Sequence, residues 1–291
     1  MRCCIAGALT TLVLAGQAIA EYPASWDVIF TPATPPPVNY TFGQQTKILN
    51  QNTTFPPAAL PLPCDIVYDR DASITLRDRT VIYTDVFRPV SDGQYPALIA
   101  LSAYGKTVPT LPQVDAPADW FSGIAKNESA DAAAFVCCGY VVVSPDNRRA
   151  GKSEENIHYW GRVDAEDGYD SIVARYVSVI RRCSATATPH GRCALEDKSA
   201  ELEKVRVPAY VIADGLSVHH SLGAVEGFRR INSNDKWLRI DDTQEWYDMY
   251  APPNERDVLR FLDHYLKGVN NGWQQASRVR AAVVPGKFVH K

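Results

Sequence analysis

The sequence has no cluster of basic residues and no apolar run long enough to span a bilayer. Its 291 residues carry 30 Lys and Arg against 33 Asp and Glu, a formal net charge of −3. A nucleic-acid-binding protein would gather Lys and Arg on one face, so we expect no nucleic-acid partner. The lack of a spanning run likewise predicts no membrane partner. With 46% hydrophobic residues, the chain can bury one sizeable core, and the composition predicts a soluble globular protein.

A shorter apolar run lies at the N-terminus. Arg2 precedes it, residues 5–14 form it, and Ala18-Ile19-Ala20 end it with small side chains. This pattern predicts a secretory signal peptide over residues 1–20, cleaved before Glu21. No Cys follows the run and the C-terminal residues match no retention signal, so we expect a secreted, extracellular protein.

The glycosylation sequons and the cysteines are consistent with secretion. The sequons begin at Asn39, Asn52 and Asn127. Cys3 and Cys4 leave with the signal peptide, and the five cysteines that remain are odd in number, so at least one is free or pairs outside the chain. Cys183 and Cys193 could close a short loop. Cys137 and Cys138 run into an apolar segment, and we expect them to be buried as two small hydrophobic side chains.

Proline separates an N-terminal arm from a folded domain. Residues 21–63 hold nine of the twenty prolines, so this arm should lie extended over a surface, and the domain is expected over 64–291. Short apolar runs predict strands at 65–70, 80–88, 95–102, 140–144, 207–213 and 236–240. Periodic segments predict helices at 166–182, 222–231 and 255–267, with Asn254 as the cap of the last and Gly268 at its end. This alternation predicts an α/β fold, with a mostly parallel sheet and helices on both faces.

Loops that follow the strands are where an α/β sheet places its chemistry. They span 103–107, 145–153, 214–220 and 241–246. In the second loop, Gly151-Lys152-Ser153 imitates the end of a phosphate-binding loop, but Asp146 stands where that motif requires glycine, so nucleotide binding is not expected.

The third loop contains a nucleophile candidate. Gly215-Leu216-Ser217-Val218-His219 imitates a G-x-S-x-G turn except at its final position. Ser217 is therefore a weak candidate nucleophile, and His219 and His220 are weak candidate bases. The alternative is a polar turn in which Ser217 caps the next helix. No Cys or carboxylate cluster at ligand spacing accompanies the two histidines, so no metal or other cofactor is expected.

Ten short blocks occur in order along the folded domain. They are LRD (76–78), TDVFRP (84–89), AYGK (103–106), GYVVVSPD (139–146), AGKS (150–153), AEDGYD (165–170), KWLR (236–239), EWYD (245–248), FLDHYLKG (261–268) and NGW (271–273). Together they resemble the X-Pro dipeptidyl-peptidase and cocaine-esterase-like (CocE/NonD-type) α/β hydrolases. The resemblance implies a serine hydrolase that cleaves a small ester, or a peptide after an X-Pro dipeptide, through an acyl-enzyme. By this resemblance, the Tyr104 hydroxyl is the hydrogen-bond donor to the oxyanion. Asp214 lies in the stretch where relatives carry the acid of the catalytic triad, so it is a possible acid.

The chain departs from that family pattern at several points. The helix beginning at Glu166 leads through the unpatterned segment 181–196 into the strand at 207–213, without a G-x-S-x-G elbow. We also expect the pocket-forming cap and the C-terminal β-sandwich of the family to be missing. Asp241 stands where relatives show His, and Arg149 where they show Gly. We therefore expect an incomplete, truncated α/β-hydrolase-type sheet lacking the nucleophile strand, and impaired catalysis. The alternatives are a non-catalytic hydrolase-scaffold remnant or binding module, and a matrix-associated glycoprotein that uses its Pro-rich arm.

Overall fold

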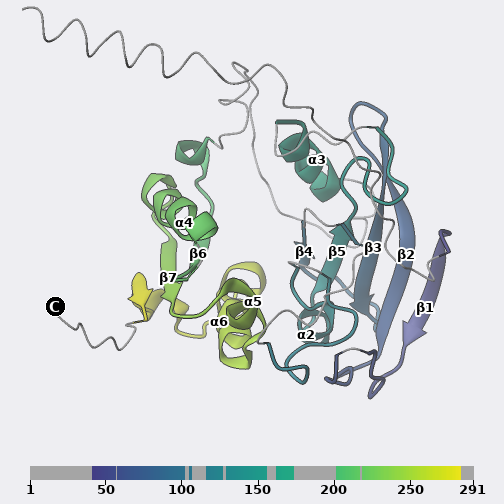
Figure 1. Cartoon of the computed structure of the whole chain (residues 1–291), viewed down its shortest axis with the longest axis horizontal. Helices are drawn as coiled ribbons and strands as arrows, with labels where there is room; N and C mark the ends of the chain where they lie inside the picture. Colours follow the sequence, from purple (N-terminus) through teal and green to yellow (C-terminus); the bar gives the residue numbers. More distant parts are fainter. Residues whose placement is uncertain are drawn as a thin grey trace, which may run out of the picture. The chain divides into compact units, whose positions relative to one another are not determined.

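The computed structural model describes residues 41–56, 58–101, 105–106, 116–126, 129–155, 162–173, 201–216 and 218–282 (Figure 1). For residues 172–173, 218–220 and 246 it describes the backbone alone. The signal peptide, residues 21–40 of the Pro-rich arm and the unpatterned segment 181–196 lie outside the described residues. Their predicted features stay predictions.

Five strands form the first sheet, in the order β1-β2-β3-β5-β4. Their bounds are β1 Gln45–Leu49, β2 Ile66–Thr75, β3 Val81–Pro89, β4 Ala97–Ile99 and β5 Val141–Pro145. The first three and β5 pair antiparallel, and β4 pairs parallel to β5. The register of β2 shifts between Asp69 and Ala72, and Asp71 within this bulge has a left-handed φ of 54°. The bulge turns Asp71 toward the sheet interior, where it is fully buried.

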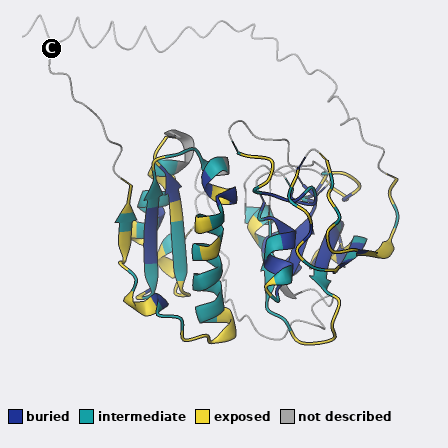
Figure 2. Ribbon diagram, turned by 90° about the horizontal axis from the view of Figure 1, so that it is seen from below, coloured by how far each residue is buried: buried dark blue, intermediate teal, exposed yellow. Residues whose placement is uncertain are grey.

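Apolar side chains of β5 and two helices build the core of this sheet. All five residues of β5 are buried. Figure 2 shows buried residues gathered along strands. Helix α2 (Ala132–Cys137) packs Phe135 and Val136 into the same cluster, and helix α6 (Pro252–Lys267) adds Leu259 and Leu262 at its margin. Asp131 caps α2 by accepting a hydrogen bond from the backbone of Ala133. Helix α3 (Arg162–Val173) is tied to the sheet by charged side chains, described below.

Three parallel strands form a second sheet, in the order β6-β7-β8. They are β6 Ala209–Asp214, β7 Lys236–Asp241 and β8 Val279–Ala281. Helix α4 (Val218–Arg230) packs against β6 (Figure 1), and the short helix α5 (Glu245–Tyr250) follows β7. Two single-turn 3₁₀ helices, Leu202–Lys204 and Trp273–Gln275, complete the described elements. Trp237 and Trp273 are fully buried, with ring centroids 5.4 Å apart.

The α/β fold predicted from the sequence is confirmed. The sheet was predicted to be mostly parallel, whereas three of the six strand pairs are antiparallel and three are parallel. Each predicted strand has a counterpart, although β2 extends to Thr75 and β4 is reduced to three residues. The predicted helix 166–182 corresponds to α3, which begins four residues earlier, and residues 174–182 lie outside the described residues. Strands β1 and β8 and helices α2 and α5 were not among the predicted elements.

Two detailed predictions are wrong. Asn254 does not cap the last helix, because α6 begins at Pro252 and the side chain of Asn254 donates to Asp248 instead. Gly268 does end that helix, with a left-handed φ of 69°. Cys137 and Cys138 are not two buried hydrophobic side chains. Cys137 forms a disulfide with Cys64, 73 residues earlier, and Cys138 is a free, exposed cysteine.

Candidate functional site

A buried lysine, Lys106, ends the AYGK block, seven residues after the end of β4. The Lys106 side chain is 1% exposed. Its ammonium donates to Asp71, in the bulge of β2, and lies 3.1 Å from the carboxylate of Asp85 on β3. The Tyr68 hydroxyl donates to the second oxygen of Asp85 at 2.7 Å. Because a buried charge is tolerated only with such partners, this cluster ties Lys106 to β2 and β3.

Asp146 joins the loop after β4 to the loop after β5. Its Oδ1 accepts a 2.6 Å hydrogen bond from the backbone N–H of Lys106. Gly105 and Gly151 have φ values of 71° and 57°, and a Cβ on either would lie 2.4 or 2.5 Å from an oxygen of this carboxylate. Both positions therefore require glycine. Burial raises the pKa of Asp146 to about 6. Nearby Lys126 is a second amine, and burial lowers its pKa.

Two arginine–carboxylate contacts hold α3 beside these loops. Arg148 binds Asp167 through two hydrogen bonds of 2.6 and 2.7 Å and contacts Asp78 at 2.8 Å. Arg77 binds both oxygens of Asp170, at 3.0 and 2.8 Å. The hydrogen bond with Arg148 lowers the pKa of Asp78 to about 2. Arg149 has a left-handed φ of 64°, the conformation that glycine adopts most readily, which accounts for the glycine that the family pattern shows there.

The ends of β6 and β7 bring two aspartates side by side. Asp214 and Asp241 are paired in register at the C-terminal ends of these parallel strands. The Asp214 side chain accepts a 3.1 Å hydrogen bond from the backbone N–H of Leu216, so it stabilises its own turn. A Cβ on Gly215 would lie 2.4 Å from the carbonyl oxygen of Asp241, so the two post-strand loops touch.

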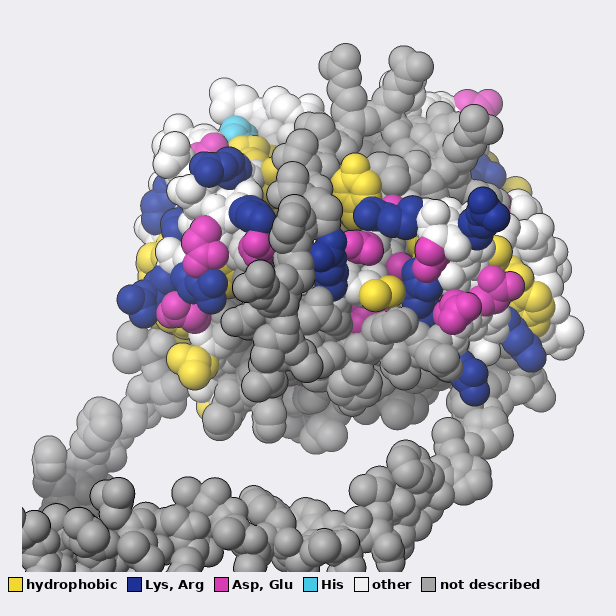
Figure 3. All heavy atoms as spheres, turned by 90° about the horizontal axis from the view of Figure 1, so that it is seen from above, with side chains coloured by type: hydrophobic (Ala, Val, Ile, Leu, Met, Phe, Trp, Pro, Cys, Tyr) yellow, Lys and Arg dark blue, Asp and Glu magenta, His cyan; other side chains and the backbone are white. Residues whose placement is uncertain are grey.

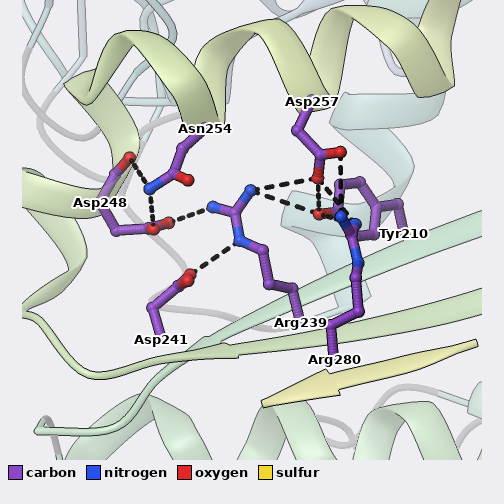
Figure 4. A network of polar contacts seen from close by, with 7 residues as sticks. All are labelled: Tyr210, Arg239, Asp241, Asp248, Asn254, Asp257 and Arg280. Atoms are coloured by element: carbon purple, nitrogen blue, oxygen red, sulfur yellow. Dashed lines mark hydrogen bonds and ion pairs between the residues drawn. The ribbon is translucent and has the colours of Figure 1, made fainter. Parts of the chain in front are cut away.

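Arg239 organises a polar network at this edge (Figure 4). Its guanidinium, 7% exposed, donates to Asp241 at 2.8 Å and to Asp248 of α5 at 2.6 Å. Its third nitrogen lies 3.4 Å from Asp257 of α6 and 3.3 Å from the Tyr210 hydroxyl. Asp241 therefore interacts with an arginine in the stretch where the family resemblance expects a histidine.

The same network extends to β8 through Asp257. Arg280 donates to both oxygens of Asp257, at 3.0 and 2.7 Å, and to the Tyr210 hydroxyl at 2.6 Å. Tyr210 in turn donates to Asp257. Burial, and then the hydrogen bond with Asp241, raise the pKa of Asp248 to about 7. This edge thus contains a carboxyl group that can hold a proton near neutral pH.

Most of the site residues predicted from the sequence lie outside the part of the chain whose side chains the structure describes. Tyr104, Ser217, Asn39 and Asn127 lie outside the described residues, and so do Cys183 and Cys193. His219 and His220 belong to the first turn of α4, where only the backbone is described. Asn52 is exposed on a turn, and Asp214 is buried at the end of β6. The Lys106 and Arg239 networks were not predicted, although Lys106, Asp85, Asp146, Arg239 and Asp248 all lie in the family-like blocks.

The described surface offers few other candidate sites. No group of three His, Cys, Asp or Glu side chains has metal-binding geometry among the described residues. None of the described helices is long and apolar enough to cross a membrane. Basic and acidic side chains are interspersed on the face shown in Figure 3.

Comparison with known proteins identifies the fold. No protein-family model matches the chain, and no curated protein matches it in sequence. Two crystal structures of a CocE/NonD family hydrolase from Staphylococcus aureus superpose with TM-scores of 0.64 and 0.63, each at 20% identity. They cover 77% and 84% of this chain, which spans 55% and 57% of theirs. The chain therefore has the fold of the CocE/NonD family hydrolases, over little more than half of their length.

Proposed function

We propose that this chain is a secreted member of the X-Pro dipeptidyl-peptidase and CocE/NonD-type hydrolases in which acyl-enzyme turnover is impaired. One observation carries the proposal: Asp241, at the end of β7, is held by Arg239 at 2.8 Å. The resemblance expects a histidine in this stretch, and a carboxylate engaged with a guanidinium is a poor base for a serine hydroxyl. The sequence supports the same conclusion, because it contains no G-x-S-x-G.

The chemistry that remains is oxyanion stabilisation and substrate binding. Without a positioned nucleophile, covalent acyl transfer has no first step. The Tyr104 hydroxyl is the group that would donate to the oxyanion of a small ester or X-Pro peptide substrate. Lys106 and Asp146 fix the backbone of residues 105–106, which directly follow Tyr104 in the sequence, and this supports the proposal.

Serine-directed labelling tests the proposal. The purified secreted protein is treated with a fluorophosphonate probe and assayed with p-nitrophenyl acetate and an Ala-Pro anilide. We expect no labelled serine and no hydrolysis above the rate without protein, in the wild type and equally in the control S91A, which changes an exposed serine two residues after β3. Labelling that S217A abolishes and S91A retains would overturn the proposal, as would hydrolysis that depends on Tyr104 and is lost in Y104F.

The alternative function is binding without turnover, on the same scaffold. The bonds of Lys106 and Asp146 favour it, because they hold the backbone and side chain of Lys106 in place whether or not a nucleophile is present. Isothermal titration with an uncleaved X-Pro dipeptide distinguishes the two. Saturable binding without hydrolysis supports a binding module, and neither binding nor hydrolysis indicates a remnant.

Secretion and glycosylation belong to the same proposal. The Cys64–Cys137 disulfide favours an oxidising compartment, because such bonds are rare in proteins that stay in the cytosol. Asn52, the one sequon asparagine within the described residues, is exposed and so accessible to a glycan. Mass spectrometry of the protein from culture medium tests cleavage before Glu21. A mature chain that still carries residues 1–20 would contradict it.

A further inference from the structure

Helix α5 connects the Arg239 network to the segment that precedes α2. Asp248 of α5 bonds to Arg239 of β7. Two residues later, Tyr250 is 2% exposed, packs against Phe121 with ring centroids 5.2 Å apart, and donates to the carbonyl of Ser129 at 3.3 Å. Tyr247, also on α5, contacts Trp120 at 4.8 Å between ring centroids. A six-residue helix thus has a polar attachment on one side and an aromatic attachment on the other.

The polar attachment contains more carboxylates than guanidinium groups. Asp241, Asp248 and Asp257 face Arg239 and Arg280, so the network carries one excess negative charge when all three are ionised. Arg280 binds Asp257 through two hydrogen bonds. Arg239 donates hydrogen bonds to both Asp241 and Asp248. The side chains of these two aspartates are 17% and 6% exposed. Two carboxylates on one buried guanidinium repel each other unless a proton lies between them.

We propose that Asp241 and Asp248 hold one proton between them, and that loss of this proton weakens the attachment of α5 to the end of β7. With the proton present, one carboxyl donates to the other while both accept from Arg239. After its loss, Asp248 keeps its bonds to Arg239 and Asn254, but it faces an ionised Asp241 where little water can screen the repulsion.

The direction of the effect follows from the proton affinity of the pair. The pKa of Asp248 is raised to about 7, against an ordinary value of 3.8, chiefly by burial. A detached α5 would expose Asp248 and return its pKa toward that ordinary value. The attached helix therefore binds the proton more tightly, so attachment weakens as the pH rises from about 4 to 7 and changes little above 7. Lower pH therefore strengthens the attachment of α5 to the end of β7.

With one exception, the neighbouring charged groups would not produce the same pH dependence between about pH 4 and 7. Burial opposes ionisation of Asp257, but its hydrogen bonds with Arg280 and Tyr210 hold its pKa below the ordinary value. Asp257 therefore titrates below this pH range, and its effect on stability has the opposite sign. Arg239, Arg280 and Tyr210 have raised pKa values and keep their protons throughout. The exception is a pair of neighbouring carboxyl groups: burial raises the pKa of Glu255 on α6 to about 7, and burial also raises the pKa of Asp131 beside it. A test must separate Glu255 from the aspartate pair.

Hydrogen exchange of the full chain from pH 5 to pH 8, corrected for intrinsic rates, provides that test. In peptides covering residues 244–252 we expect protection to fall at least about fivefold between pH 5 and 7 and then to level off. In D241N the amide can donate to Asp248 and still accept from Arg239, so protection should stay within about twofold over the range. The controls E255Q and D242N should keep the wild-type profile, because Asp242 is exposed and outside the network. Peptides from β2 and β3 report global unfolding.

Two results would overturn the proposal. One is wild-type protection of α5 that does not depend on pH, and the other is the same pH dependence in D241N as in the wild type. Should D241N fail to fold, the wild-type chain still decides the matter. Carboxyl ¹³C NMR of Asp248 should show a midpoint near pH 7, whereas a midpoint near its ordinary value of about 4 would rule out the shared proton.

Discussion

Gly215 lies against the backbone of Asp241, so closely that a Cβ at position 215 would fall 2.4 Å from the Asp241 carbonyl oxygen. Because the obstacle is backbone, it cannot rotate away as a side chain would. We expect G215A to reduce the free energy of unfolding by about 1–3 kcal/mol in urea denaturation. G223A is the matched control: it lies in α4, nothing stands within 4 Å of its new Cβ, and it should stabilise the chain by about 0.5–1 kcal/mol. Equal effects of the two variants would contradict the close approach.

Lys106 neutralises two buried carboxylates, Asp71 and Asp85. Replacing it by methionine keeps most of its volume and removes its charge. We expect K106M to lower the free energy of unfolding by about 3–5 kcal/mol, because both carboxylates lose their buried partner. Lys47 on β1 is exposed, and K47M should change stability by no more than about 0.5 kcal/mol. Thermal and urea unfolding check both, and a K106M variant as stable as K47M would contradict the role of the cluster.

Sequence patterns predicted the strands well because each depends on local information. Residues 140–144, for example, are apolar up to Ser144, and β5 occupies Val141–Pro145. Helix α5 was missed because its six residues EWYDMY are too few to show a helical period. Helix α2 was missed because an apolar segment ending in two cysteines also fits a strand.

Contacts between distant segments could not be predicted in the same way. The Cys64–Cys137 pairing depends on two segments 73 residues apart, and the sequence leaves several pairings open. Arg239 and Asp248 lie in family-like blocks, but no local rule shows that they meet, or that Asp257 and Arg280 join them. Asn254 fits the composition of a helix cap, yet Pro252 starts the helix earlier, since proline is well suited to the first turn.

The disulfide between Cys64 and Cys137 links the segment before β2 to the end of α2. Peptide mapping without reduction should recover these two cysteines in one linked peptide, with Cys138 alkylated as a free thiol. Removing the bond in C64A/C137A should cost about 2–4 kcal/mol of unfolding free energy, because it frees a long loop in the unfolded chain. C138A should leave stability within about 0.5 kcal/mol of the wild type. A linked peptide that contains Cys138 would contradict this pairing.

Glu255 should make stability depend on pH. Burial raises its pKa to about 7 from an ordinary 4.5, so folding favours the protonated form, and its contribution is lost as the pH rises from 4.5 through 7. E255Q should therefore be more stable than the wild type by about 1–2 kcal/mol at pH 8, and by much less at pH 5. Urea unfolding at both pH values measures this difference. In the control E226Q, on the surface of α4, the change in stability should be the same at both. A pH-independent effect of E255Q would contradict the burial of this carboxyl.

Asn52 should carry an N-linked glycan when the chain passes through a secretory pathway. Its side chain is exposed, its φ is 63°, and its backbone N–H is already bonded to the carbonyl of Leu62 at 2.9 Å. Enzymatic deglycosylation in ¹⁸O water should mark Asn52 by conversion to labelled Asp. N52Q and T54A should lose the mark, while T53A, which keeps the sequon, should retain it. An unmodified Asn52 in secreted protein would contradict the prediction.

The arginine contacts of α3 restrict that helix to a single rotational setting. Asp167 and Asp170 are three residues apart and so project from the same side of the helix, one toward Arg148 and the other toward Arg77. Turning α3 by one residue would carry both carboxylates about 100° away, and both guanidinium groups would lose their bidentate partners at once. Apolar side chains would accommodate such a rotation by small adjustments, whereas these two ion pairs are either both formed or both lost.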